Sequence, residues 1–225
     1  IGLAYYADVP GVIWDIARVG PSTGLPTRTQ QGDISMLYEA SHGDTQHLVL
    51  IPGNVDECFE FGWKAFDYAE KYQTMVFGFT DLDLGMNDWM REELSWDDKY
   101  VPNKGKVLSA DKLEKIDKFY RYLDSDGDGV AYRTYPGVHP KGAYFVRGSG
   151  HNKFGGYTED SEEYQEVIDR LIKKFKTAST MVPKPVITKC KKKTKSAIIS
   201  IGSCDYAVLE AIDSLYKDGR NTLGL

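Results

Sequence analysis

The sequence predicts an α/β fold built on a parallel sheet, followed by the beginning of a second α/β unit. Three short and nearly continuous apolar runs rich in strand-forming residues lie at 9–16, 47–53 and 74–81. Such runs are typical of strands that are covered on both faces, as in parallel sheets. Stretches with helical periodicity lie between them, and strands alternating with helices in this way indicate the α/β class.

The first two helices are predicted from their periodicity and their end signals. Residues 54–72 begin with Asn54 as an expected N-cap and carry Glu57 three positions later, which is a capping-box arrangement. Apolar residues then recur near helical spacing and give one apolar stripe. A shorter helix is expected at 33–41.

Residues 82–110 mix acidic and aromatic residues without a period, so a long surface segment is expected there. A helix over 111–123 follows, with Asp111 as its expected cap. Residues 132–160 are rich in glycine and predict turns. A further helix is expected at 161–176, because acidic residues lead it and lysines end it, as the helix dipole favours.

The last part of the chain has the pattern of a strand, a glycine turn, a helix and a terminal glycine, which opens a second α/β domain. We therefore expect three parts: an α/β domain at 1–110, a connecting part at 111–195 and the start of the second domain at 196–225. The lysine-rich stretch 184–195 is interpreted as a solvated linker, with attraction of phosphate groups or of an acidic partner protein as the alternative.

Composition limits the classes of function. The 225 residues are 41% hydrophobic and 12% aromatic, as expected of a globular protein, and the net charge of −5 gives no reason to expect nucleic acid or an anionic membrane as a partner. No apolar run approaches the ~20 residues that span a bilayer. The chain begins at Ile1 inside an apparently folded region, so it is expected to be part of a longer protein.

The cysteines Cys58, Cys190 and Cys204 are widely and irregularly spaced. This spacing argues against a zinc site or a complete iron–sulfur cluster held by this chain alone. It also argues against a secreted disulfide scaffold, so a reducing cytoplasm is the expected compartment.

The loop "ARVGPSTGLPT" at 17–27 is the strongest candidate for a binding site. It follows a predicted parallel strand, and ligands of α/β folds bind at that edge of the sheet. Its glycines allow backbone N–H groups to approach a ligand, its prolines restrict its conformations, and its arginine can grip a carboxylate through two hydrogen bonds. Such preorganised donors suit a 2-oxo acid, while an ordinary crossover loop with a surface arginine is the alternative. The residues assigned to the substrate site are Arg18, Gly20, Ser22, Thr23, Gly24 and Thr27.

The same loop carries a family resemblance. "RVGPSTGLPTRTQQGD" (18–33) resembles the signature of the α subunit of 2-oxoacid:ferredoxin oxidoreductases, in the 2-oxoglutarate branch. The segment 48–87 follows the family's strand–helix–strand pattern, 132–160 is similar to its glycine-rich connection, and 198–219 resembles the start of its second domain. The resemblance therefore covers nearly the whole chain.

The resemblance implies a thiamine-diphosphate-binding, transketolase Pyr-like parallel-sheet domain that is incomplete at its N-terminus, followed by the start of a transketolase C-terminal-like domain. It implies oxidative decarboxylation of 2-oxoglutarate to an acyl-coenzyme A with reduction of ferredoxin, or the reverse carboxylation. Pyruvate or a branched-chain 2-oxo acid is the alternative substrate. A non-catalytic α/β scaffold with a Ca²⁺-binding loop is the alternative function.

In this family the arginine and the last threonine of the signature line the substrate pocket, which assigns catalytic roles to Arg18 and Thr27. A cation and a hydroxyl suit the negative charge that develops on the carbonyl oxygen. The resemblance places thiamine diphosphate with Mg²⁺, and a [4Fe-4S] cluster, mainly on a partner β subunit. It also implies coenzyme A as co-substrate, ferredoxin as partner and an (αβ)₂ assembly. The family's "YPITP" motif does not occur here, and the glutamate that activates thiamine is expected upstream of Ile1.

The stretch "DSDGDG" places Asp124, Asp126 and Asp128 at positions 1, 3 and 5 of an EF-hand-like loop, with Tyr135 instead of glutamate at position 12. A structural Ca²⁺ or Mg²⁺ is one interpretation, and a solvated, metal-free turn is the other. Among the four histidines, His151 is the best candidate for a functional contact, while their scatter argues against a metal cluster.

Overall fold

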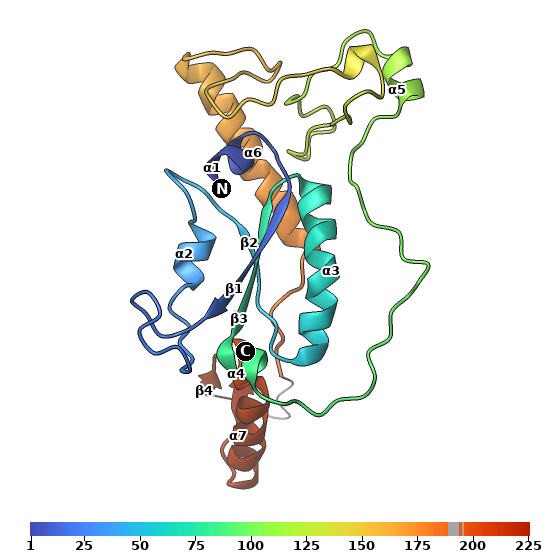
Figure 1. Cartoon of the computed structure of the whole chain (residues 1–225). Helices are drawn as coiled ribbons and strands as arrows, with labels where there is room; N and C mark the ends of the chain where they lie inside the picture. Colours follow the sequence, from blue (N-terminus) through green and yellow to red (C-terminus); the bar gives the residue numbers. More distant parts are fainter. Residues whose placement is uncertain (189–193, 195) are drawn as a thin grey trace.

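The computed structural model describes residues 1–188, 194 and 196–225, and its centre is a three-stranded parallel sheet (Figure 1). The strands are β1 (Gly11–Ala17), β2 (Leu48–Leu50) and β3 (Met75–Asp81), in the order β1-β3-β2. Each strand lies in one of the three predicted apolar runs, although β1 extends one residue further. The predicted α/β class with a parallel sheet is confirmed.

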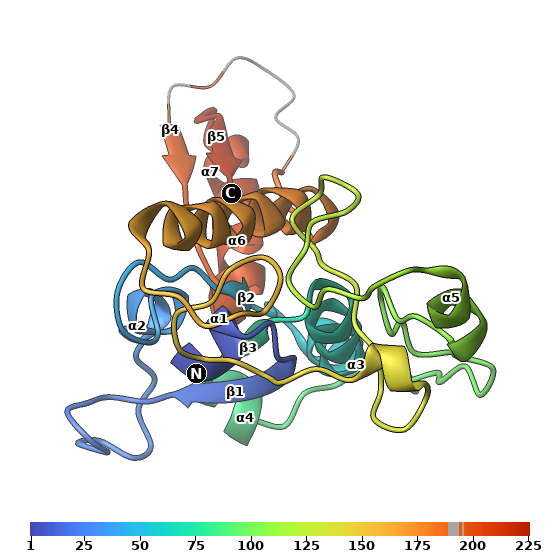
Figure 2. The ribbon, with the colours of Figure 1, turned by 90° about the horizontal axis from the view of Figure 1, so that it is seen from above.

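Helices cover both faces of this sheet (Figure 2). The long helices α3 (Val55–Tyr72) and α6 (Ser161–Met181) share one hydrophobic core with Val76 of β3, and α2 (Ile34–Tyr38) shares the other with Phe77 and Phe79. Successive side chains of a strand point to opposite faces. This two-sided burial explains why β3 is an unbroken apolar run. The short α1 (Gly2–Tyr6) contributes to both cores.

The helix ends agree in part with their sequence signals. The Asn54 side chain accepts a hydrogen bond of 2.9 Å from the Glu57 N–H, as predicted. The Glu57 carboxylate accepts from the N–H of Gly53, at 2.7 Å, rather than from that of Asn54. Helix α6 begins where predicted, with Asp160 accepting from two N–H groups of its first turn, and continues five residues beyond 176 to Met181.

The helix predicted at 111–123 is largely absent, and this prediction was wrong. The helix α5 spans only Ala110–Lys115 and is capped by Ser109 rather than by Asp111. Beyond it the chain is irregular, because the neighbouring residues Arg121 and Tyr122 are both buried in contacts with the rest of the protein. Tertiary contacts override local helical periodicity there.

A long surface segment lies between α4 (Leu82–Met86) and α5, as predicted, and has neither helix nor strand from 88 to 106 (Figure 1). It is attached to the outer side of α3 by aromatic packing. The ring centroid of Trp96 lies 6.3 Å from that of Trp63, and Tyr100 lies 4.9 Å from Trp63. The Tyr100 hydroxyl also donates a hydrogen bond of 2.5 Å to the Asp67 carboxylate.

The chain from 196 onward forms the expected strand–turn–helix unit. It consists of β4 (Ser196–Ile198), the 3₁₀ turn η2 (Gly202–Cys204), α7 (Asp205–Lys217) and β5 (Thr222–Gly224), and its two strands are parallel. In Figure 1 the unit formed by residues 196–225 lies beyond the carboxyl end of β3, beside α4. Another 3₁₀ turn, η1, lies earlier in the chain, at Pro140–Gly142.

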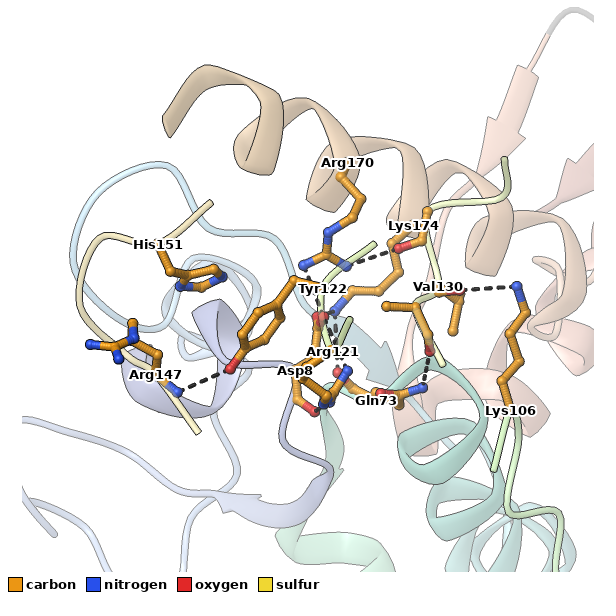
Figure 3. A network of polar contacts seen from close by, with 12 residues as sticks. Asp8, Gln73, Lys106, Arg121, Tyr122, Val130, Arg147, His151, Arg170 and Lys174 are labelled. Atoms are coloured by element: carbon orange, nitrogen blue, oxygen red, sulfur yellow. Dashed lines mark hydrogen bonds and ion pairs between the residues drawn. The ribbon is translucent and has the colours of Figure 1, made fainter. Parts of the chain in front are cut away.

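A buried charge network joins the N-terminal segment to α6 (Figure 3). The Asp8 carboxylate lies 2.6 Å from Lys174 Nζ and 2.8 Å from an Arg170 nitrogen. The Arg121 guanidinium donates a hydrogen bond of 2.8 Å to the Asp8 carbonyl oxygen. All four side chains are less than a tenth exposed. One carboxylate thus serves three cations inside the protein.

The ionisation of this network follows from its unequal charges. Burial pushes the pKa of Asp8 upward, but the neighbouring cations outweigh burial and lower it to about 2. Burial lowers the pKa of Lys174 to about 8, and Asp8 offsets only part of that effect because the two arginines oppose it. Asp8 is therefore the ion on which the other three depend.

We predict unequal losses of stability when this network is cut from its two sides. Asp8→Asn keeps a residue type that tolerates the positive φ of 54° at this position, but leaves three buried cations without a counter-ion. The free energy of unfolding should fall by ~3–5 kcal/mol. Lys174→Met should cost only ~1–2 kcal/mol, because Asp8 keeps Arg170.

Urea unfolding of these two variants, with Lys173→Met as the control, checks this order. Lys173 is the exposed neighbour of Lys174 and pairs with Asp124 at 3.4 Å, so its replacement should change stability by less than ~0.5 kcal/mol. Equal losses in Asp8→Asn and Lys174→Met would contradict the unequal sharing of charge.

Candidate functional site

The loop after β1 is held by its own backbone. The N–H of Leu25 donates to the carbonyl oxygen of Val19 at 3.2 Å, and the N–H of Val19 donates to that of Arg28 at 3.1 Å. The Gln30 side chain accepts from the N–H of Gly20 at 3.2 Å. The loop is therefore folded on itself, as its prolines and glycines led us to expect.

The structure places all six predicted substrate residues on this one loop at the carboxyl end of β1, and all six are exposed in the chain. One of the two predicted glycines has a clear steric reason. A Cβ atom at Gly24 would lie 3.0 Å from the Gly20 carbonyl oxygen, so the two halves of the loop could not approach as closely with a larger residue. The six residues are Arg18, Gly20, Ser22, Thr23, Gly24 and Thr27.

Asp81 ends β3 directly beside the start of the loop, because Ala17 and Asp81 are partners in the β1–β3 ladder. It is fully buried and caps α4, where its carboxylate accepts from the Leu84 N–H at 3.2 Å. It also accepts from the Ser203 N–H at 2.9 Å. Burial raises the pKa of this carboxyl group, but these hydrogen bonds outweigh burial and hold the pKa below its ordinary value. Asp81 is therefore ionised at neutral pH.

Gln31 connects the far end of the loop to the same place. Its Nε2 atom lies 3.4 Å from Asp81 Oδ2 and 3.1 Å from the carbonyl oxygen of Ile201. Neither Gln31 nor Asp81 was predicted from the sequence as a site residue. The signature includes Gln31, but its partners are 50 and 170 positions away, so no local pattern could connect them.

A second carboxylate near the loop was also missed. Asp15 lies on β1, and its Oδ2 atom is buried without a hydrogen-bond partner. Burial and the nearby Asp33 raise the pKa of its carboxyl group. The edge of the sheet under the loop thus holds one strongly ionised carboxylate, Asp81, and one that takes up a proton more readily than an ordinary aspartate.

A lysine side chain pairs with the Asp-rich turn, where the sequence left a bound cation and a metal-free turn open. Lys106 Nζ occupies the centre of the turn, 2.7 Å from Asp126, 2.8 Å from Asp128 and 2.9 Å from the carbonyl oxygen of Val130. Asp124 instead accepts from the Asp128 N–H at 3.1 Å. Across the part of the chain that the structure describes, no three His, Cys, Asp or Glu side chains form a group that fits a metal ion.

His151 is buried and packs against two tyrosine rings. Its ring centroid lies 4.0 Å from that of Tyr122 (Figure 3) and 4.6 Å from that of Tyr6. Burial lowers its pKa, so the ring is neutral at pH 7. Cys58 and Cys204 are free thiols, while Cys190 and most of the lysines of 184–195 lie outside the described residues.

The parallel sheet, the loop at its carboxyl edge and the second unit docked there define an α/β protein. Residues 1–109 match the model of the family "Pyruvate flavodoxin/ferredoxin oxidoreductase, thiamine diP-bdg". The chain is a homologue of the α subunits of 2-oxoacid:ferredoxin oxidoreductases, as its signature indicated.

Two relatives illustrate this homology. The chain is 31% identical to 2-oxoacid:ferredoxin oxidoreductase 2, subunit alpha, of Aeropyrum pernix over 97% of its own length and 33% of the relative's. It is 32% identical to 2-oxoglutarate synthase subunit KorA of Methanocaldococcus jannaschii over 78% of its own length and 45% of the relative's. The chain therefore spans only a third to a half of these proteins.

A solved structure confirms the fold. The 2-oxoglutarate:ferredoxin oxidoreductase from Magnetococcus marinus, with 2-oxoglutarate, coenzyme A and succinyl-CoA bound, superimposes with a TM-score of 0.80 at 22% identity. The match covers 99% of this chain and 38% of that one.

Among the described residues, none of the helices is long and apolar enough to span a membrane.

We predict that calcium leaves the melting temperature unchanged. A cation bound only by the folded state must raise the melting temperature, but the Lys106 ammonium already pairs with both Asp126 and Asp128. Thermal unfolding with millimolar Ca²⁺ and with a chelator should give the same midpoint. A midpoint that rises with calcium concentration would restore the metal hypothesis.

Proposed function

We propose that the chain is part of the α subunit of a thiamine-diphosphate-dependent 2-oxoacid:ferredoxin oxidoreductase, and that its loop 18–30 binds the 2-oxo acid. The observation that carries the proposal is the position of the loop. Its arginine and hydroxyls extend from the carboxyl edge of a parallel sheet, in a domain of a thiamine-diphosphate-binding family. Ligands of open α/β sheets bind at that edge.

In this proposal Arg18 grips the carboxylate of the substrate and Thr27 donates a hydrogen bond to its carbonyl oxygen. A guanidinium pairs with a carboxylate through two parallel hydrogen bonds, which fixes orientation as well as position. Donors placed where negative charge develops lower the barrier, and the folded loop holds them before the substrate arrives. Both side chains are exposed in the single chain, so a partner surface must close the site.

Thiamine diphosphate, when bound, supplies the nucleophilic carbon that attacks the 2-oxo acid. Among the described residues, no three or more His, Cys, Asp and Glu side chains form a group that could hold a metal ion. Following the family resemblance, we assign the diphosphate, its Mg²⁺ and the [4Fe-4S] cluster to a β subunit. Coenzyme A as co-substrate, ferredoxin as electron acceptor, an (αβ)₂ assembly and a cytoplasmic location belong to the same proposal.

We favour 2-oxoglutarate as the substrate over pyruvate or a branched-chain acid. The loop carries a second arginine, Arg28, whose carbonyl oxygen lies 3.1 Å from the N–H of Val19, next to Arg18. The backbone hydrogen bond thus brings Arg28 next to the neighbour of Arg18 in the sequence. Two arginines on one loop suit a substrate with two carboxylates. Several of the matched proteins are also named for 2-oxoglutarate. We keep the domain limits 1–110, 111–195 and 196–225 in this proposal.

We predict that Arg18→Ala and Thr27→Val each lower kcat/KM for the 2-oxo acid by ~10²-fold or more, the usual effect of losing one such donor. The assay is ferredoxin or methyl viologen reduction by the complete complex of α and β subunits. Arg220→Ala, an exposed arginine just beyond α7, is the matched control and should keep full activity. Unchanged turnover in Arg18→Ala, with normal assembly, would favour the non-catalytic scaffold.

Arg28→Met tests the choice of substrate. It should raise KM for 2-oxoglutarate by ~10-fold, because one charge-assisted hydrogen bond to the distal carboxylate is lost, and leave KM for pyruvate unchanged. Steady-state kinetics of the complete complex with both acids measures the difference. An equal rise for the two acids would assign Arg28 to the structure of the loop instead.

A further inference from the structure

The loop that carries the proposed substrate residues is held at both ends by the same pair of strands. Its start follows Ala17, which is paired with Asp81 in the parallel ladder. Its end is held by Gln31, whose amide lies 3.4 Å from Asp81 Oδ2. The first contact belongs to the backbone of the sheet, whereas the second depends on one side chain.

The second α/β unit meets Gln31 and Asp81 at this point. The Gln31 amide also donates to the carbonyl oxygen of Ile201 at 3.1 Å, and Asp81 Oδ2 accepts from the Ser203 N–H at 2.9 Å. The residue between them, Gly202, has a φ of +64°. A Cβ atom there would lie 2.8 Å from Asp81 Oδ2 and 3.0 Å from Gln31 Nε2. Only glycine permits this contact without displacing the carboxylate and the amide.

We propose that Gln31 is a positioning residue, which holds the substrate loop through a clasp formed by Gln31, Asp81 and the Gly202–Ser203 turn. This inference rests on the proposed function and adds to it a route by which the second unit acts on the substrate site. A shift of the turn moves two groups together: the Ser203 N–H, which donates to Asp81, and the Ile201 carbonyl oxygen, which accepts from Gln31. The shift therefore moves the end of the loop. Misplacing catalytic groups by about 1 Å can cost ~10²-fold in rate.

The test is Gln31→Glu in the complete complex of α and β subunits. At pH 8 the introduced carboxylate would be ionised and would face the ionised Asp81, so that the two groups repel each other and release the end of the loop. The charge of Asp81 also raises the pKa of the introduced carboxyl group. At pH 6 the introduced group, once protonated, can again donate a hydrogen bond. Relative to wild type at each pH, kcat/KM for the 2-oxo acid should fall at least ~10-fold at pH 8 and recover toward pH 6.

Gln165→Glu is the matched control, because Gln165 donates to the Asp169 carboxylate at 2.9 Å on the exposed side of α6. It creates the same pair of carboxylates away from the clasp and should follow the wild-type pH profile. Gly202→Ala provides a second variant, in which the added methyl group blocks the clasp at every pH. Its kcat/KM should fall without any recovery at pH 6.

Hydrogen exchange of the loop peptide 18–30 gives a readout that does not need turnover. At each pH the exchange rate of Gln31→Glu is divided by the wild-type rate at the same pH. This ratio should be larger at pH 8 than at pH 6. If Gln31→Glu exchanges like wild type and has the wild-type kcat/KM at both pH values, the clasp is overturned. If its loop exchanges faster but its kcat/KM is unchanged, the positioning role is overturned. A wild-type complex that oxidises no 2-oxo acid would overturn the proposed function, while exchange would still decide whether the clasp holds the loop.

Discussion

The parallel ladder between β1 and β3 determines where the candidate site lies. Because the two strands run in the same direction and end in register, Ala17 and Asp81 lie side by side at one edge of the sheet. The loop leaves from the first of these residues, α4 begins after the second, and the second α/β unit docks against Asp81 through Ser203. An antiparallel pair would have placed the loop and α4 at opposite edges.

The other determinant of the fold is the buried charge network around Asp8. The core between the sheet, α3 and α6 is hydrophobic, yet Asp8 and its three cations lie buried at its border. A buried ion pair is weak evidence for stability, because desolvation offsets attraction. What the structure shows is a link between segments, since Asp8 of the N-terminal segment contacts Arg121 and the α6 residues Arg170 and Lys174.

Local patterns in the sequence were enough for most of the sheet and its helices. The continuous apolar runs of β1 and β3 and the cap of α3 at Asn54 depend on near neighbours, and the structure has them. The signature loop was also found, although its roles in binding stay predictions. The error at 111–123, and the pairing of the Asp-rich turn with Lys106, have another origin. There, residues distant in sequence, Asp8 for Arg121 and Lys106 for Asp128, decide the local structure, and one sequence without an alignment carries no sign of such pairs.

The ammonium group of Lys106 gives the Asp-rich turn an unusual independence from its surroundings. An ion bound from solution is present only as far as its concentration and affinity allow, whereas a cation attached to the same chain stays at a fixed, high local concentration. The turn would therefore keep this cation at any concentration of divalent ions in the cell. The turn depends instead on the charge of Lys106. Acetylation of this lysine would remove its positive charge and leave the carboxylates of Asp126 and Asp128 without this counter-ion.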